Sequence, residues 1–185
     1  GLTHPGCLSK YAIDGIFSSV VYKGVVKKIV YQFKYPPYLS QLQESIVALC
    51  YEGIIQNEMF MRMLLEPALF IPIPIHDSRM RKRGYNQATY LASGLSDRFA
   101  IPVCAALSRI KNTKTQVGLT KDERKDNIRD AFLVAPSYRS LLSQYQQVFL
   151  VDDVATSGAT LLEAAKVLKK QGVSRVYGVT FAHGE

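Results

Sequence analysis

Two adjacent carboxylates, Asp152 and Asp153, stand where an apolar run ends and a turn of small residues begins. Carboxylates accept hydrogen bonds from the vicinal hydroxyls of a ribose, or hold Mg²⁺ directly or through water. Small hydroxyl residues and a glycine at a strand-to-helix turn allow backbone N–H groups and the helix dipole to surround a phosphate. The turn consists of Thr156, Ser157, Gly158, Ala159 and Thr160. Acids followed by a phosphate-binding turn predict a ribose 5-phosphate site.

Acids at the end of an apolar strand are also found in three other settings. Two acids can simply solvate the end of the strand. A P-loop ATPase also has a metal-binding acid, but the sequence contains no G-x-x-x-x-G-K-[ST]. Receiver domains carry paired acids after their first strand, whereas only one further helix and strand follow this pair. The turn that comes after the acids favours the ribose phosphate hypothesis over simple solvation.

Two basic segments supply the cations that phosphates require. The first follows an Ile-Pro-Ile-Pro strand end and is expected to be a loop that holds a pyrophosphate through backbone amides and guanidinium groups; its members are Arg79, Arg81, Lys82, Arg83 and Gly84. The second is long, polar and without an apolar period, which is typical of a mobile flap over a site; its candidate residues are Arg109, Lys111, Lys114, Thr115, Gln116 and Arg124. A solvated loop and a nonspecific basic patch remain the alternatives for the two segments.

Strands alternating with helices must position these groups. We expect strands over residues 69–75, 101–107, 147–151 and 175–182, and helices over 86–99 and 160–171. Thr160 and Glu163 suggest a capping box for the last helix, and Gly172 suggests its end. Buried strands linked through helices predict a parallel sheet covered on both faces, with ligands beyond the carboxyl ends of the strands.

The first part of the chain has a different pattern. Residues 13–22 predict a strand, residues 25–34 a helix that ends at Pro36-Pro37, and residues 39–63 a further helical region. We expect residues 1–67 to form an amino-terminal hood or lid and residues 68–185 the α/β core of one compact unit.

Length and composition narrow the function classes. The 185 residues suffice for one domain, and 48% hydrophobic with 21% charged residues excludes a disordered chain. No apolar run is long enough to span a bilayer, and three widely spaced cysteines point to a reducing cytoplasm. A net charge of +8 favours an anionic partner such as phosphate, nucleotide or nucleic acid.

Residues 148–160, VFLVDDVATSGAT, resemble the phosphoribosyl pyrophosphate (PRPP) signature of type I phosphoribosyltransferases. The resemblance implies that Asp152 and Asp153 bind the ribose hydroxyls and that residues 156–160 hold the 5-phosphate. Some purine-salvage members have a proton-accepting aspartate where this chain has Thr156, which argues against simple hypoxanthine or guanine salvage. The implied fold is the type I phosphoribosyltransferase fold, a parallel sheet flanked by helices with a small hood.

The wider set of motifs is similar to the ComF/GntX branch of these proteins, from Asp14 onward. They are Pro-Ile-Pro, Arg-x-Arg-x-Arg-Gly-Tyr-Asn-Gln, Lys-Thr-Gln-Val-Gly-Leu, Arg-x-x-Asn and Ala131-Phe132. This resemblance implies a cytoplasmic protein of natural competence that acts on incoming single-stranded DNA alongside a helicase and recombination proteins. A homodimer is left open, and no membrane partner is expected.

ComF-like proteins often begin with a four-ligand zinc module, and this chain has only the half-site His4 and Cys7 near its start. Structural Zn²⁺ requires four ligands, so zinc is not expected here, whether the module has decayed or its other ligands precede Gly1. Cys50 and Cys104 are expected in the core. His76 and His183, near strand ends, receive no role.

The resulting hypothesis is a pentosyl transferase that uses PRPP and Mg²⁺, which is held by Asp152 and Asp153. An unknown acceptor would displace pyrophosphate from C1 of PRPP. The alternative is a non-catalytic accessory or regulator of single-stranded DNA processing, in which the PRPP site acts as a sensor.

Overall fold

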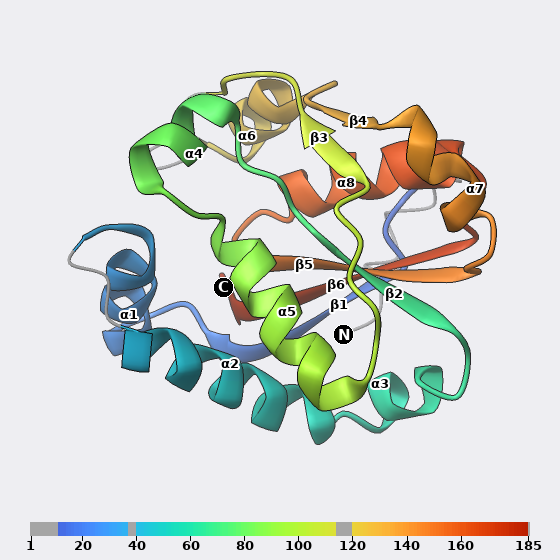
Figure 1. Cartoon of the computed structure of the whole chain (residues 1–185). Coiled ribbons are helices and arrows are strands. Elements are labelled where there is room, and N and C mark those ends of the chain that lie inside the picture. The colour runs from blue at the N-terminus through green and yellow to red at the C-terminus, as the bar shows by residue number, and fades with distance from the viewer. Residues whose placement is uncertain (1–10, 37–39, 114–119, 185) are drawn as a thin grey trace.

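A parallel sheet between two helical layers organises the chain (Figure 1), in a computed structural model that describes residues 11–36, 40–113 and 120–184. The strands lie in the order β1-β6-β5-β2, with bounds Gly15–Val21, Arg175–His183, Gln147–Ala155 and Ala68–Pro72. All three neighbouring pairs are parallel. A single bridge between Phe70 and Val103 extends the sheet beyond β2. The predicted α/β class is confirmed.

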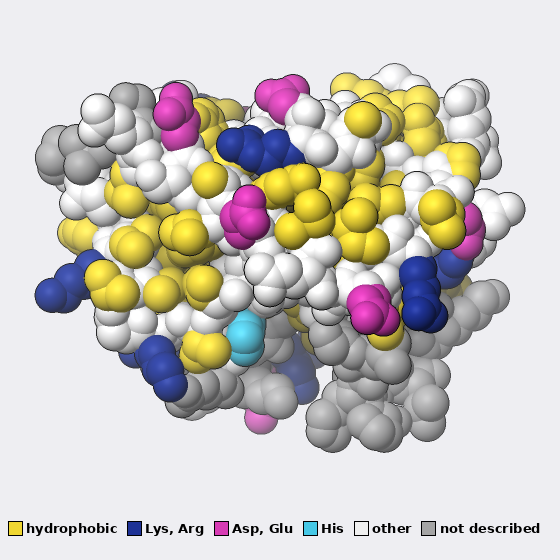
Figure 2. All heavy atoms as spheres, turned by 90° about the horizontal axis from the view of Figure 1, so that it is seen from below, with side chains coloured by type: hydrophobic (Ala, Val, Ile, Leu, Met, Phe, Trp, Pro, Cys, Tyr) yellow, Lys and Arg dark blue, Asp and Glu magenta, His cyan; other side chains and the backbone are white. Residues whose placement is uncertain are grey.

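Different helices cover the two faces. One face packs against α1 (Val25–Lys34), α2 (Ser40–Ile55), α3 (Glu58–Met63) and α5 (Gln87–Phe99), around a cluster of rings that includes Phe60, Phe70 and Phe149. From below, the outer side of this layer shows apolar side chains among scattered charged ones (Figure 2). The other face packs against α8 (Ala159–Lys170) and a small antiparallel sheet of β3 (Leu107–Arg109) and β4 (Phe132–Val134). The sheet is therefore buried on both sides, as its apolar strands require.

The remaining elements are short. α4 (Asp77–Arg83) follows β2, and α6 (Lys121–Ile128) lies between β3 and β4. A 3-10 turn (Pro136–Tyr138) and α7 (Arg139–Leu142) lead from β4 to β5. Within the described residues, no helix combines the length and the apolar character needed to cross a membrane.

The region expected to act as a hood contributes directly to the sheet. β1 pairs along its length with β6, and α2 crosses β1 so closely that a Cβ at Gly53 would lie 2.5 Å from the Cβ of Ser19. The described part of residues 1–67 therefore shares the core with the rest of the chain. Its action as a lid stays a prediction.

One prediction about helices is confirmed and one was wrong. The helical region predicted over 39–63 is present as two helices, α2 and α3, because the Asn57 side chain accepts a hydrogen bond from the Phe60 amide at 3.1 Å and starts α3 as a new helix. The basic segment expected as a loop is the helix α4. Its start is capped by His76, and it ends at Gly84, whose φ of 83° is the left-handed conformation that glycine adopts without strain.

The predicted strand 101–107 is reduced to the single bridge at Val103, since Pro102 has no N–H for a ladder. The strand that does form nearby, β3, belongs to the separate antiparallel sheet. β5 is longer than predicted and includes both acids, because β6 continues beside it and pairs Asp152 with Thr180 and Ala155 with His183.

The predicted capping box of α8 is also wrong. The N-cap is Gly158, with no side-chain cap, and Glu163 instead accepts a hydrogen bond from the Asp130 amide at 3.0 Å. Gly172 does follow the end of the helix with a φ of 96°, as predicted.

Candidate functional site

The two acids face opposite sides of the sheet, because neighbouring residues of a strand alternate. Asp153 is only 5% exposed, and its carboxylate lies 2.7 Å from Nζ of Lys34 on α1. Asp152 is half-buried and lines a small hollow together with the turn that follows β5. The structure thus places Asp152, rather than the pair, beside the predicted phosphate-binding turn.

Burial and neighbouring charges shift the pKa values of Asp152 and Lys34. Burial, followed by the charge of Asp153, raises the pKa of Asp152 to about 7. Burial alone lowers the pKa of Lys34, but the carboxylates of Asp153 and Asp152 outweigh it, so the pKa of Lys34 is raised overall. Lys34 and Asp153 therefore form a compensated ion pair, while Asp152 is left as the group that a cation or hydroxyl donor would stabilise.

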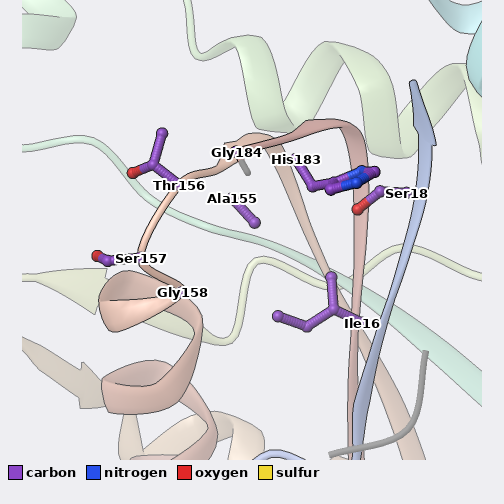
Figure 3. Close-up of a pocket in the computed structure, with 8 residues that line it drawn as sticks. All are labelled: Ile16, Ser18, Ala155, Thr156, Ser157, Gly158, His183 and Gly184. Carbon is purple, nitrogen blue, oxygen red and sulfur yellow. The ribbon is translucent and has the colours of Figure 1, made fainter. Parts of the chain in front are cut away.

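The turn after β5 is shaped for close approach by a ligand. Gly158 has a φ of 70°, and the Ala159 amide points toward Oγ of Ser157 at 3.5 Å. A larger hollow of about 420 Å³ opens on the other side of the turn, toward β1 and β6. Figure 3 shows its lining: Ile16, Ser18, Ala155, Thr156, Ser157, Gly158, His183 and Gly184. We call Asp152 and the turn through Thr160 the acidic side of the site.

Arg79 and Arg109 both donate hydrogen bonds to Thr113. We call these three residues the basic side of the site. Arg79 donates from Nη2 to the Thr113 carbonyl at 2.6 Å, and Arg109 donates from Nη2 to the Thr113 hydroxyl. Thr113 is 8% exposed, and the guanidinium of Arg109 lies over the Phe132 ring at 5.6 Å. Two cations from α4 and β3 are thereby brought together in a half-buried position.

This arrangement destabilises both charges. Burial, and then the charge of Arg79, lowers the pKa of Arg109 to about 10, although the charge of Asp152 acts in the opposite direction. Burial, and then Arg83, lowers the pKa of Arg79. Neighbouring guanidinium groups that repel each other in a poorly solvated position are stabilised by an anion. The basic side is therefore suited to a phosphate or pyrophosphate.

The other residues of α4 do not join this pair. Arg81 and Lys82 are exposed, and Arg83 donates to Oε1 of Gln87 at 2.5 Å while its guanidinium lies 5.4 Å from the Tyr35 ring centroid. Gly84 ends the helix. Of the predicted pyrophosphate set, Arg79 is the residue seen to donate a hydrogen bond to Thr113 among the described residues.

Of the residues predicted for the flap, one also reaches the site and another does not. Arg124, on α6, donates to the Thr156 hydroxyl at 2.9 Å and so reaches the acidic side. Lys111 binds the Arg129 carbonyl at 2.8 Å and takes no part in the site. Lys114, Thr115 and Gln116 lie outside the described residues.

Asp152 offers part of the coordination that Mg²⁺ requires. A carboxylate oxygen is the ligand that this ion prefers, and Mg²⁺ takes its other ligands from water and substrate phosphates. Among the described residues no cluster of three or more His, Cys, Asp or Glu side chains is present, so the protein offers no complete cage there. The zinc half-site of His4 and Cys7 lies outside the described residues.

Three contributors were missed from the sequence: Lys34, Thr113 and His183. Lys34 had one usable signal, since it is a cation four residues after the buried Val30 on the same helix face. Thr113 and His183 had none, because their roles depend on contacts with residues far away in the chain.

Comparison with known proteins agrees with this geometry. The family model of the phosphoribosyl transferase domain matches residues 86–184, more than half of the chain. The chain therefore belongs to the phosphoribosyl transferase domain family. The matched part contains β5, the acidic side and Arg109.

Curated relatives point to one branch of that family. The chain is 41% identical to Competence protein F of Haemophilus influenzae over 111 residues. The matched segment covers 60% of this chain and 48% of that protein. It is 32% identical over 111 residues to the DNA utilization protein YhgH of Escherichia coli K12, covering 60% and 47%. It is 32% identical over 104 residues to Competence protein ComFC of Bacillus subtilis, covering 56% and 39%. The chain thus spans about half the length, or less, of these relatives, and the resemblance to the ComF branch is confirmed.

Proposed function

We propose that this chain binds PRPP with Mg²⁺ and transfers the phosphoribosyl group to an acceptor with release of pyrophosphate. The observation that carries the proposal is the pair Arg79 and Arg109 on Thr113, which lies across from Asp152 and the turn after β5. Two anion-binding groups flank one carboxylate, and PRPP has a phosphate at one end, a pyrophosphate at the other and ribose hydroxyls between them.

Each group of residues then has its own role in the reaction. The turn at residues 156–160 holds the 5-phosphate, Asp152 accepts hydrogen bonds from the ribose hydroxyls, and Arg79 and Arg109 stabilise the charge that develops on pyrophosphate. The bond from C1 to the pyrophosphate oxygen breaks, and a bond from C1 to the acceptor forms. Mg²⁺, when bound, neutralises part of the phosphate charge. Arg124 ties α6 to the turn and restricts water at the 5-phosphate.

Separate titrations with fragments of the substrate test this division. By calorimetry in Mg²⁺, inorganic pyrophosphate should bind 10-fold to 100-fold more weakly to an Arg79→Gln/Arg109→Gln variant, because a charge-assisted hydrogen bond contributes roughly 1.5–3 kcal/mol. Ribose 5-phosphate should bind that variant normally. An Asp152→Asn/Asp153→Asn variant should bind ribose 5-phosphate more weakly and inorganic pyrophosphate normally. The affinity for PRPP should fall in both variants.

Asp97→Asn is the matched control, since Asp97 is exposed on α5 away from the turn. Undiminished PRPP binding to the Asp152→Asn/Asp153→Asn variant, with a normal unfolding transition, would reject the ribose assignment. Release of pyrophosphate that depends on an added acceptor distinguishes a transferase from a protein that only binds PRPP.

A second function, handling of single-stranded DNA in the cytoplasm during DNA uptake, is favoured by the names of the relatives and by the net charge of +8. In that role the PRPP site would act as a sensor, and recombination proteins would be the partners. Binding of both ligands by one chain is compatible with either role.

A further inference from the structure

The outer surface formed by α1 and α4 carries exposed cations that the acidic and basic sides of the site do not use. The sequence has no Asp or Glu between Asp14 and Glu44, and none between Asp77 and Asp97. On α1, Lys27 and Lys28 are exposed; on α4, Arg81 and Lys82 are exposed. These two helices lie at the end of the molecule where the strands have their carboxyl ends (Figure 1).

Two tyrosines on this surface are exposed. Tyr31 is 63% exposed and Tyr35 is 38% exposed, and their ring centroids lie 4.7 Å apart with a tilt of 36°. Tyr31 follows Lys27 by four residues, so both share one side of α1, and Tyr35 caps the end of the helix. Basic and apolar side chains also lie next to each other at the α1 end of Figure 2.

The two helices are joined into one surface. The guanidinium of Arg83 lies over the Tyr35 ring, and the Tyr85 hydroxyl and the Gln87 amide both donate to the Phe33 carbonyl near the end of α1, the latter at 3.2 Å. These contacts hold the rings in place relative to the cations of α4. The rings therefore do not have to be ordered when a ligand binds.

We propose that this α1–α4 surface binds single-stranded nucleic acid, with a base stacked on the open side of the Tyr31–Tyr35 ring pair and backbone phosphates held by the surrounding cations. The inference rests on the nucleic-acid function proposed above and adds the surface and the mode of binding. The exposed Tyr31 ring, supported by Tyr35 and lying next to cations, is the combination that an unpaired base and a phosphate backbone require. A duplex keeps its base faces stacked inside and cannot use the rings.

An anionic membrane is the other partner that a basic helix with aromatic residues can bind. The packing of α1 favours a nucleic acid, because Val30 and Phe33 are buried against the sheet and Val25 is the one aliphatic side chain of this helix that is exposed for entry into a lipid layer. The other exposed side chains of α1 are Lys27, Lys28 and Tyr31.

The cations of this surface differ from those of the PRPP site, although Arg79 lies on the same helix, α4. Arg79 and Arg109 are held by Thr113, and Lys34 by Asp153, so these three cations are engaged elsewhere. PRPP and a nucleic-acid strand should therefore bind at the same time.

Fluorescence anisotropy with a labelled oligothymidine, the matching oligouridine and a DNA duplex tests the proposal. A Tyr31→Ala/Tyr35→Ala variant should bind the oligothymidine at least 10-fold more weakly, since stacking contributes about 1–3 kcal/mol per base. Tyr31→Phe/Tyr35→Phe should bind normally, because it keeps the rings. Equal binding of single strand and duplex, or full affinity in the alanine variant, would overturn the stacking mode, whereas the comparison of thymidine with uridine strands identifies the nucleic acid.

The cations are tested by salt dependence. Lys27→Gln/Lys28→Gln should lower the slope of log affinity against log salt by about 1.4, at roughly 0.7 for each phosphate contact. Arg139→Gln/Lys170→Gln removes the same charge from exposed positions on α7 and α8 and should leave the slope nearly unchanged. An equal decrease in the control would show a general charge effect and reject the surface.

Two further measurements keep this proposal apart from the PRPP proposal. Calorimetry should show normal PRPP affinity in the Tyr31→Ala/Tyr35→Ala variant, and saturating Mg²⁺-PRPP should leave the anisotropy of the DNA complex unchanged. Displacement of the DNA by PRPP would place the strand over the PRPP site and overturn this location. Binding of anionic vesicles, lost in the same variant while DNA binding persists, would assign the surface to a membrane instead.

Discussion

The acidic and basic sides of the site are held in place by different means. On the acidic side, Asp152 belongs to a central strand that is paired on both edges, and the turn after it continues directly into α8. On the basic side, Arg79 and Arg109 come from a seven-residue helix and a three-residue strand, and side-chain hydrogen bonds to Thr113 join them. A main chain within a sheet moves only with the sheet, whereas a side-chain hydrogen bond breaks alone. Substitutions on the acidic side should therefore change the stability of the whole fold, and those on the basic side should change mainly the anion affinity.

The largest effect is expected where α1 meets the acidic pair. Lys34→Met should lower the free energy of unfolding by about 3 kcal/mol, because it leaves the carboxylate of Asp153 buried without its cation. Urea unfolding at pH 7 measures the change. The double variant Lys34→Met/Asp153→Asn should recover most of the loss, and a double variant as unstable as Lys34→Met would show that Lys34 contributes by packing.

Lys34 also predicts a pH dependence. Because the folded-state pKa of Lys34 is raised above 10.5, its contribution to stability is fully present below pH 10.5 and is lost as the pH rises through that raised value. The difference in unfolding free energy between the native protein and Lys34→Met should accordingly shrink in strongly alkaline buffer.

Unlike Lys34, Asp152 should lower the stability of the folded state at neutral pH, although it serves the binding of the ligand. Its folded-state pKa of about 7, against an ordinary 3.8, means that the native state loses stability as the pH rises from about 4 to 7. In metal-free buffer at pH 8, Asp152→Asn should therefore be more stable than the native protein by on the order of 2 kcal/mol. The gain should vanish at pH 4. Thermal unfolding at the two pH values measures it, and a gain that is independent of pH would contradict the raised pKa.

A smaller loss is expected at the turn. Gly158→Val should cost about 1–2 kcal/mol, because a φ of 70° is strained for a side chain with a Cβ and most of all for a β-branched one. Space is not the cause, since an added Cβ would meet only Ile16 Cδ1, at 3.8 Å. Gly158→Asn is the matched control, because asparagine tolerates the left-handed region better. Similar stability and ribose 5-phosphate affinity in both variants would mean that the conformation of the turn is not required.

The smallest effect is expected on the basic side. Thr113→Val keeps the shape of the side chain but removes the hydroxyl that accepts from Arg109, so the inorganic pyrophosphate affinity should fall by about 1 kcal/mol, or roughly 5-fold. The free energy of unfolding should change less than in Lys34→Met. A loss of stability as large as that of Lys34→Met would contradict the distinction between the two sides.

The arrangement of the acidic side could be predicted because it lies within one continuous stretch; its role in binding PRPP stays a prediction. The apolar run, the acids, the small residues and the helix appear in the order in which they are used, so local chemistry sufficed to place Asp152 beside the turn. What was wrong there, the end of β5 and the cap of α8, was decided by neighbours: β6 extends the strand, and Asp130 engages Glu163.

By itself, the sequence determined the alternation of strands and helices, the acidic pair with its turn, and the abundance of cations, since each is a local pattern of residue types. Only the tertiary structure decided which acid faces the turn and which is paired with Lys34, which arginines meet at Thr113, and which cations remain exposed on α1 and α4. The reason is that each of these contacts joins segments distant in the chain, and a side chain's partner there depends on register and packing rather than on its sequence neighbours.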